Sequence, residues 1–164
     1  MFLSVSAQYS RVSSQAEGSS DMDNVEIKKI LEGATSVAVI GVSSNPERAS
    51  HQVAAYLIEQ THFDVYLVNP TVDGEILGKP VYKSLADLPV VPDIIDVFRK
   101  GEDMPGVFEK EFPAIAGSAA GKTWWMQQGI RSDEVATLAE NSGMKVIMDR
   151  CIKVDYQNLV PEGK

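Results

Sequence analysis

The chain of 164 residues is 44% hydrophobic and 23% charged, which fits one globular domain with its own core. Its formal net charge of -8 at pH 7 argues against a nucleic-acid or anionic-membrane binder, because such proteins need basic patches. The single cysteine, Cys151, excludes an internal disulfide, and no apolar run approaches the ~20 residues of a membrane span. We therefore expect a soluble, cytoplasmic protein with no metal site.

The N-terminal segment does not have the pattern of a folded element. Residues 1–22 are rich in serine and show little apolar periodicity, so they bury too little surface to offset the entropy of ordering. We predict a flexible tail followed by a domain over residues 23–160. Arg11 and the absence of acidic residues before Glu17 keep mitochondrial targeting open as an alternative.

The rest of the chain alternates between apolar runs and helical stripes. The predicted strands are Ser36–Gly41, Asp64–Asn69, Asp93–Phe98, Lys122–Gln127 and Lys145–Met148. The predicted helices span about 24–33, 50–60, 103–115 and 132–142. Asp23 or Asn24 is placed to cap the first helix and Ser132 the last, while Pro113 must bend or end the third.

This alternation predicts an α/β fold. Short β-branched strands separated by helices are typical of a doubly wound, parallel, Rossmann-like sheet, here with five strands in one domain. Right-handed crossovers favour the strand order 3-2-1-4-5, with the switch point between strands one and four. Trp124 and Trp125 point to alternate faces of the fourth strand, so we expect one under each helical layer.

The loop after the first strand has features of a phosphate site. Gly41 permits a sharp turn, Ser43 and Ser44 offer short polar groups, and Arg48 supplies a charge suited to phosphate. Ser50 or a neighbour is placed to cap the following helix, whose positive end would face the anion. The alternative is an ordinary surface turn.

The nicotinamide-dinucleotide fingerprint is incomplete. Ser43 and Pro46 stand at the second and third glycine positions of G-x-G-x-x-G. The second strand ends in Asn69–Pro70, without an acid to accept a hydrogen bond from a ribose 2′-hydroxyl. Both departures argue against NAD, although an NAD(P)-dependent oxidoreductase remains the alternative.

A family resemblance rests on segments spread over residues 38–156. They are Val39–Arg48, Ser50–His51, Val68–Pro70, Gly74–Tyr82, Ser84–Leu85, Asp96–Arg99, Trp125–Ile130 and Met148–Cys151. In these segments the chain resembles the stand-alone CoA-binding proteins of the CoA-binding domain superfamily. Their fold is that of the nucleotide-binding half of the succinyl-CoA synthetase alpha subunit.

The resemblance implies that coenzyme A binds along the switch-point crevice. The implied contacts are Gly41, Ser43, Ser44 and Arg48 to the phosphates, Val68, Asn69 and Pro70 to the adenosine, and Phe98 and Arg99 as the far wall. Many relatives carry a basic residue after Asn-Pro, where this chain has Thr71, and Lys79 is the candidate to compensate.

No catalytic pair is evident in the sequence. His51 is a candidate phosphate contact or an ordinary cap, and His62 is expected to be a plain loop residue. Cys151 is either a small buried hydrophobe or, beside Arg150, a thiol able to form a mixed disulfide with CoA. We expect a carrier, sensor or regulatory module that is not an enzyme, with a subunit of an acyl-CoA ligase as a further alternative. The sequence leaves homo-oligomers and protein partners open.

Overall fold

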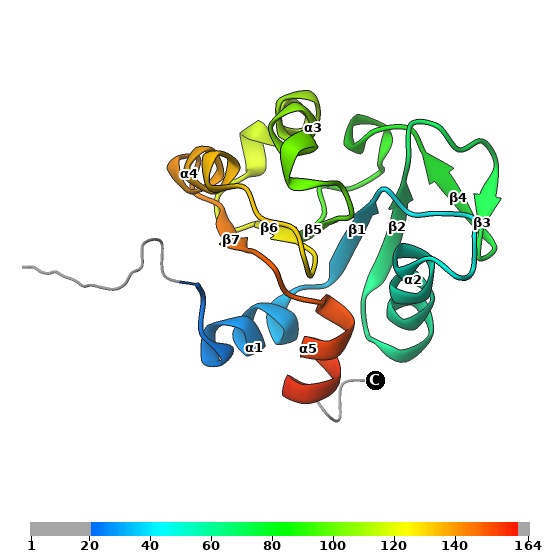
Figure 1. The fold of residues 1–164 in the computed structure, drawn as a ribbon, viewed down its shortest axis with the longest axis horizontal. Helices are drawn as coiled ribbons and strands as arrows, with labels where there is room; N and C mark the ends of the chain where they lie inside the picture. Colours follow the sequence, from blue (N-terminus) through cyan, green and yellow to red (C-terminus); the bar gives the residue numbers. More distant parts are fainter. Residues whose placement is uncertain (1–20, 161–164) are drawn as a thin grey trace, which may run out of the picture.

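The computed structural model of the protein describes residues 21–160, so the predicted tail before Asp21 lies outside the described residues. Helices cover both faces of a central sheet (Figure 1). The helices are α1 (Asn24–Gly33), α2 (Ala49–Gln60), α3 (Met104–Glu111), α4 (Asp133–Asn141) and α5 (Ile152–Leu159). The strands are β1 (Ser36–Ile40), β2 (Asp64–Val68), β3 (Glu75–Ile76), β4 (Lys79–Tyr82), β5 (Ile94–Val97), β6 (Thr123–Met126) and β7 (Lys145–Ile147).

The described strands form one sheet in the order β3-β4-β2-β1-β5-β6-β7. Neighbouring strands are parallel except for the antiparallel pair β3 and β4. The predicted fold class, a single doubly wound Rossmann-like α/β domain, is confirmed. The sheet is larger than expected, because a hairpin adds two strands at one edge.

The predicted strand order was wrong. It placed the strand over residues 93–98 beyond the second strand, but β5 pairs with β1 on the side away from β2. The place beyond β2 belongs to β4, a strand that was not predicted because Gly78 and Pro80 are typical of turns. Counted with β4, the parallel strands follow the order 3-2-1-4-5-6 of dinucleotide-binding folds. The switch point therefore lies between β1 and β5.

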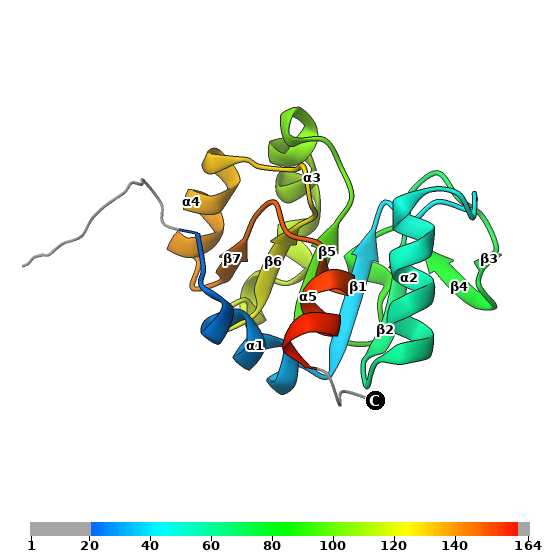
Figure 2. The ribbon, with the colours of Figure 1, turned by 60° about the horizontal axis from the view of Figure 1, so that its bottom comes forward.

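The two faces of the sheet carry separate cores. Helices α1, α2 and α5 cover one face, and α3 and α4 cover the other (Figures 1 and 2). Trp125 packs in the first core and Trp124 in the second, as the alternation of the strand predicts. Both indoles are fully buried, so these side chains belong to the framework of the fold.

Three predicted helix-end signals are confirmed, at the starts of α1 and α4 and at the end of α3. Asp23 accepts a hydrogen bond from Glu26 N at 2.9 Å, and Ser132 accepts one from Val135 N at 3.2 Å. Helix α3 ends at Glu111, where Pro113 lies in a short 3-10 turn. Glu111 itself is buried and accepts a hydrogen bond from Leu85 N at 2.9 Å.

Two further features, near the ends of the described residues, belong to the folded domain. Met22 packs against the core beneath α1, so the described fold begins before the first helix. Helix α5 was not predicted, and it packs against α1 and α2. Within residues 21–160 no helix is both long enough and apolar enough to cross a bilayer.

Candidate functional site

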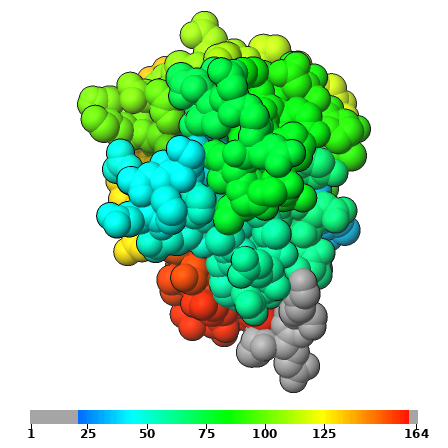
Figure 3. Space-filling view, turned by 90° about the vertical axis from the view of Figure 1, so that its right-hand side faces the viewer, coloured from blue at the N-terminus to red at the C-terminus, as the bar shows by residue number. Residues whose placement is uncertain are grey.

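A crevice opens at the carboxyl edge of the sheet, between β1 and β5. Its volume is about 300 Å³, and its lining residues are Gly41, Ser43, Arg48, Ala49, Ser50 and Phe98. Figure 3 shows the loop after β1 (cyan) at the surface, beside the chain that carries β3 and β4 (green). Ligands of doubly wound folds bind at this switch point, because the loops of diverging crossovers leave a gap there.

Gly41 fixes the shape of the crevice. Its φ is +90°, and a Cβ added there would lie 2.6 Å from the carbonyl oxygen of Phe98. Gly41 N donates to Val68 O at 2.8 Å, so the turn is also tied to β2. Only glycine combines this left-handed conformation with such a close approach of two backbone segments.

The loop after β1 is held by its own side chains. Ser43 N donates to Ser50 Oγ at 2.9 Å, and Asn45 N donates to Ser43 Oγ at 3.0 Å. His51 Nδ1 lies 2.8 Å from Ser43 O. Because a carbonyl oxygen only accepts, His51 Nδ1 is the donor in this pair. Hydrogen bonds within the protein therefore hold the loop in its shape.

Ser50 does not cap the helix, as one interpretation of the sequence had it. Arg48 is the N-cap residue of α2 and makes no capping hydrogen bond with its side chain. Ser50 is buried within the first turn, and its hydroxyl is used to hold Ser43. The exposed guanidinium of Arg48 is thus left to face the crevice at the positive end of α2.

The residues at the end of β2 and directly after it hold the loop that lines the crevice. The side chain of Val68 is fully buried, so only its backbone reaches Gly41. Asn69 Nδ2 donates to Val42 O at 2.8 Å, and Asn69 Oδ1 accepts from Thr71 N at 3.0 Å. The amide of Asn69 therefore ties the first two loops together, and half-buried Pro70 follows it.

Basic side chains follow the carboxyl ends of several strands in this acidic protein. Arg99 is exposed directly after Phe98, and its guanidinium lies 3.8 Å from Asp103. Ser44 is exposed in the first loop. Lys79, by contrast, begins β4 at the amino edge, so the structure does not bring it to the crevice. Lys83 follows β4 at the carboxyl edge and donates to Val72 O at 2.9 Å.

Lys83 was missed because β4 was missed. Once Lys79–Tyr82 is a parallel strand, the next residue must lie at the ligand-binding edge. Gln127, which follows β6, is buried and accepts a hydrogen bond from Ile152 N at 3.1 Å. It therefore positions α5. Cys151 is half-buried at the N-cap of that helix.

A buried acid lies beneath the crevice. Asp96, in β5, is 0% exposed, and neither of its carboxylate oxygens has a hydrogen-bond partner in the described structure. Burial raises the pKa of Asp96 well above its usual range. Asp96 was not among the predicted site residues, although a carboxylate inside an apolar strand is itself a signal.

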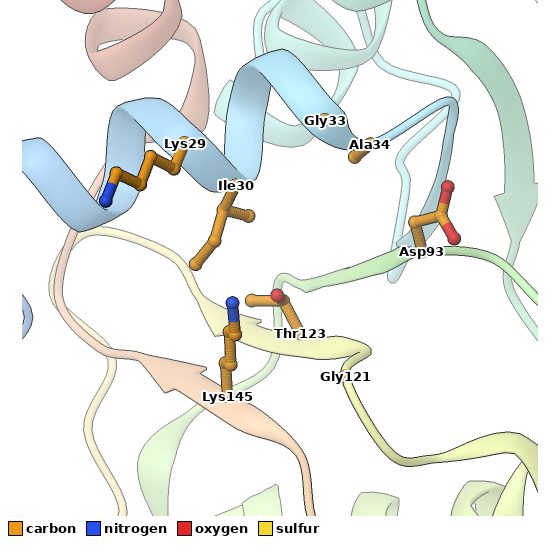
Figure 4. Close-up of a pocket in the computed structure, with 8 residues that line it drawn as sticks. All are labelled: Lys29, Ile30, Gly33, Ala34, Asp93, Gly121, Thr123 and Lys145. Atoms are coloured by element: carbon orange, nitrogen blue, oxygen red, sulfur yellow. The ribbon is translucent and has the colours of Figure 1, made fainter.

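A second cavity, of about 200 Å³, lies at the opposite edge of the sheet (Figure 4). Figure 4 shows the ammonium group of Lys29 directed away from Lys145 and Thr123. Asp93 at its rim accepts from Thr35 N at 2.8 Å and from Lys122 Nζ at 2.9 Å. Burial raises the pKa of Asp93, but these hydrogen bonds outweigh it and leave the pKa below its ordinary value. The polar groups here do not converge on a common point.

Both histidines form hydrogen bonds with other residues of the chain. His62 Nε2 lies 2.8 Å from Ala34 O, and His62 Nδ1 lies 2.8 Å from Tyr156 Oη. The imidazole therefore links the ends of α1 and β2 to α5. Within residues 21–160 no group of three or more His, Cys, Asp or Glu side chains is placed to hold a metal ion.

Comparisons with known proteins agree with this geometry. Residues 35–157 match a protein family described as "CoA binding domain". The uncharacterized protein YneT of Bacillus subtilis (strain 168) is 38% identical over 131 residues, which are 80% of this chain and 92% of that protein. A structure from Thermus thermophilus, cell-free ID.343, is 34% identical with a TM-score of 0.74, over 84% of this chain and 99% of that one.

A larger enzyme contains the same fold. The dinucleotide-forming acetyl-coenzyme A synthetase 1 of Ca. Korarchaeum cryptofilum is similar with a TM-score of 0.60 at 21% identity. The similarity covers 75% of this chain but 27% of the synthetase. At this identity the likeness extends to the fold alone.

Proposed function

The chain belongs to the CoA-binding-domain family, and we propose that it binds coenzyme A or an acyl-CoA in the crevice between β1 and β5. The observation that carries the proposal is the prefolded loop of Gly41–Arg48 at the switch point, with Arg48 at the positive end of α2. Backbone N–H groups and a guanidinium are the groups that bind a pyrophosphate or 3′-phosphate. In this arrangement the negative charge of the ligand is bound by backbone N–H groups and a guanidinium in the loop, although the whole protein is acidic.

The contacts divide into direct and supporting groups. Gly41, Ser43, Arg48, Ser50 and Phe98 line the crevice, and Ser44, Arg99 and His51 stand at its margin. Val68 and Asn69 act mainly by holding the first loop in place, and Pro70 follows them in the chain. Because the loop already has its hydrogen bonds, binding costs little ordering entropy, which favours affinity.

We further propose that the protein is a carrier, sensor or regulatory module without chemistry of its own. The imidazole of His51 is tied to Ser43 O, and that of His62 to Ala34 and Tyr156. The hydroxyl beside His62 belongs to the buried Tyr156, and among the described residues His51 makes no hydrogen bond to a nucleophilic side chain. Such a module would present or withhold bound CoA, and a protein partner would supply any reaction.

Titration calorimetry of the nucleotide-stripped protein with CoA, acetyl-CoA, NAD and NADP tests the ligand class. We expect saturable binding of CoA or acetyl-CoA and none of the nicotinamide cofactors. Binding of NAD or NADP alone would reject the proposal in favour of an oxidoreductase. Turnover of acetate, CoA and ATP only when a co-purified larger chain is present would favour a ligase subunit.

The variant Arg48→Ala should bind CoA more weakly by ~1–3 kcal/mol, because it removes a charge-assisted hydrogen bond to phosphate. Lys29→Ala is the matched control, since it removes one positive charge at the opposite edge of the sheet. Calorimetry should give an unchanged dissociation constant for the control. An equal loss in both variants would mean that only net charge matters, and Arg48 would then not belong to the site.

The variant Cys151→Ser should bind CoA as tightly as the wild type, because the proposed contact is noncovalent. The half-buried Cys151 is better explained as part of the packing around α5. Calorimetry with and without a reductant checks the affinity, and intact mass spectrometry checks for a CoA adduct. A reductant-sensitive adduct that disappears in the variant would establish the mixed disulfide instead.

A further inference from the structure

The carboxyl group of Asp96 lies directly below the wall of the crevice. In the sheet Asp96 is level with Val39 of β1 and Trp125 of β6, both of which face the core under α1, α2 and α5. Phe98, two residues further along, lies on the same face and lines the crevice. Side chains two residues apart on a strand are about 7 Å apart, so Asp96 is one step behind the ligand wall.

No charged group on this face forms a hydrogen bond with Asp96 in the described structure. Helix α1 turns only Ile27, Ile30 and Leu31 into the core. From α2, Tyr56 packs against this core, and Arg48 and His51 lie at the start of the helix. From around α5, Cys151 and Tyr156 pack in this core, and Arg150 and Asp155 lie beside them in the chain. Arg150 donates to Asp155 at 2.8 Å, His51 is bound to Ser43 O, and Tyr156 is bound to His62.

We propose that Asp96 is a ligand-linked proton site: the crevice binds its anionic ligand with Asp96 in the neutral form and loses affinity when Asp96 ionises. This inference rests on the proposed binding of CoA. Burial raises the pKa of Asp96 and favours its neutral form, which presents no charge to the ligand phosphates. Once ionised, it would place an uncompensated negative charge behind them, in a medium that screens poorly.

The linkage has a definite sign. A bound anion disfavours the ionised carboxylate, so CoA should raise the pKa of Asp96 further, and by reciprocity ionisation must weaken CoA binding. At a separation near 10 Å and an effective dielectric constant near 20, the expected weakening is roughly tenfold. In the pH range between the pKa of Asp96 in the free protein and its higher pKa in the CoA-bound protein, CoA binding should be accompanied by uptake of a proton from solvent.

The test compares CoA affinity from pH 5 to pH 9 for the wild type, Asp96→Asn and Asp93→Asn. The ligand's own titration is common to all three proteins, so ratios of dissociation constants isolate the protein group. We expect the wild type to lose about tenfold relative to Asp96→Asn as the pH rises through the titration of Asp96. The ratio of wild type to Asp93→Asn should stay flat, because Asp93 lies at the far edge of the sheet.

Carboxyl carbon-13 NMR of the wild type provides the second measurement, independent of any variant. The titration of Asp96 should move to higher pH when CoA saturates the protein. Parallel affinity profiles for the wild type and Asp96→Asn, or an Asp96 titration that CoA does not move, would overturn the inference while leaving CoA binding intact. Absence of CoA binding by the wild type at every pH would instead reject the proposed function, and the inference with it.

Discussion

Replacing Gly41 with alanine should destabilise the protein by about 2–5 kcal/mol and remove CoA binding. A non-glycine residue at φ +90° costs roughly 1–2 kcal/mol, and overpacking adds roughly 1–3 kcal/mol. The clash is with the backbone oxygen of Phe98, which cannot move without shifting β5 away from β1. The same shift would open the crevice wall, so stability and binding should fail together.

Gly74→Ala is the matched control for this prediction. Gly74 has a similar φ of +86°, but an added Cβ would meet no atom within 4 Å. It should therefore lose only the conformational contribution, and CoA binding should survive. Urea denaturation gives both free energies of unfolding, and calorimetry gives the affinities. Equal costs at the two positions would show that the close approach to Phe98 has no energetic importance.

The sequence predicts the frame of this fold because each central strand is a β-branched run with a distinct stop. Ser36–Ile40 is buried along its whole length, which is the condition that produces such a run in a parallel sheet. Helix α1 was equally predictable, since Asp23 and Gly33 are the capping and ending residues of an ordinary helix. These signals are local, so no tertiary information was needed to identify them.

The missed elements are those whose residues serve tertiary contacts. β4 contains Pro80, and its strand conformation depends on pairing with β2 and β3. Helix α5 buries Asp155 within its apolar stripe, where Arg150 neutralises it. A polar residue in the stripe hides the helical period from sequence reasoning. The error in the predicted strand order had the same cause. Because β4 was not predicted, its place beyond β2 was assigned to the next strand in the chain.

The position of the candidate site was predictable from the sequence, but the hydrogen-bonding roles of its side chains were not. The switch-point rule located the loop of Gly41–Arg48 without any structure. Nothing in the sequence, however, distinguishes Ser50 as an internal acceptor from Ser50 as a cap, because both roles suit a serine near a helix start. Asn69 likewise fits a ligand contact or a loop tie equally well until its partners are known.

The variant Asp96→Asn should raise the free energy of unfolding, and the gain should grow with pH. Above a pH of about 4 the unfolded chain releases the proton of an aspartate, whereas the buried carboxyl of Asp96 keeps it. The unfolded state then binds fewer protons, so the wild type loses about 1.4 kcal/mol of stability per pH unit until Asp96 itself ionises in the folded state. Asparagine has no such titration.

Asp93→Asn should behave in the opposite way, which makes it a stringent control. The lowered pKa of Asp93 contributes stability above its unfolded pKa, and that contribution is lost as the pH falls through the folded pKa. Urea denaturation of both variants from pH 3 to pH 8 measures the two slopes. A constant difference between the wild type and Asp96→Asn over this range would mean that Asp96 titrates normally, and hence that solvent or a bound cation reaches it.

The pKa shifts of these two aspartates have opposite signs because their surroundings differ. Asp93 has Thr35 and Lys122 as partners, whereas Asp96 has only apolar neighbours in register.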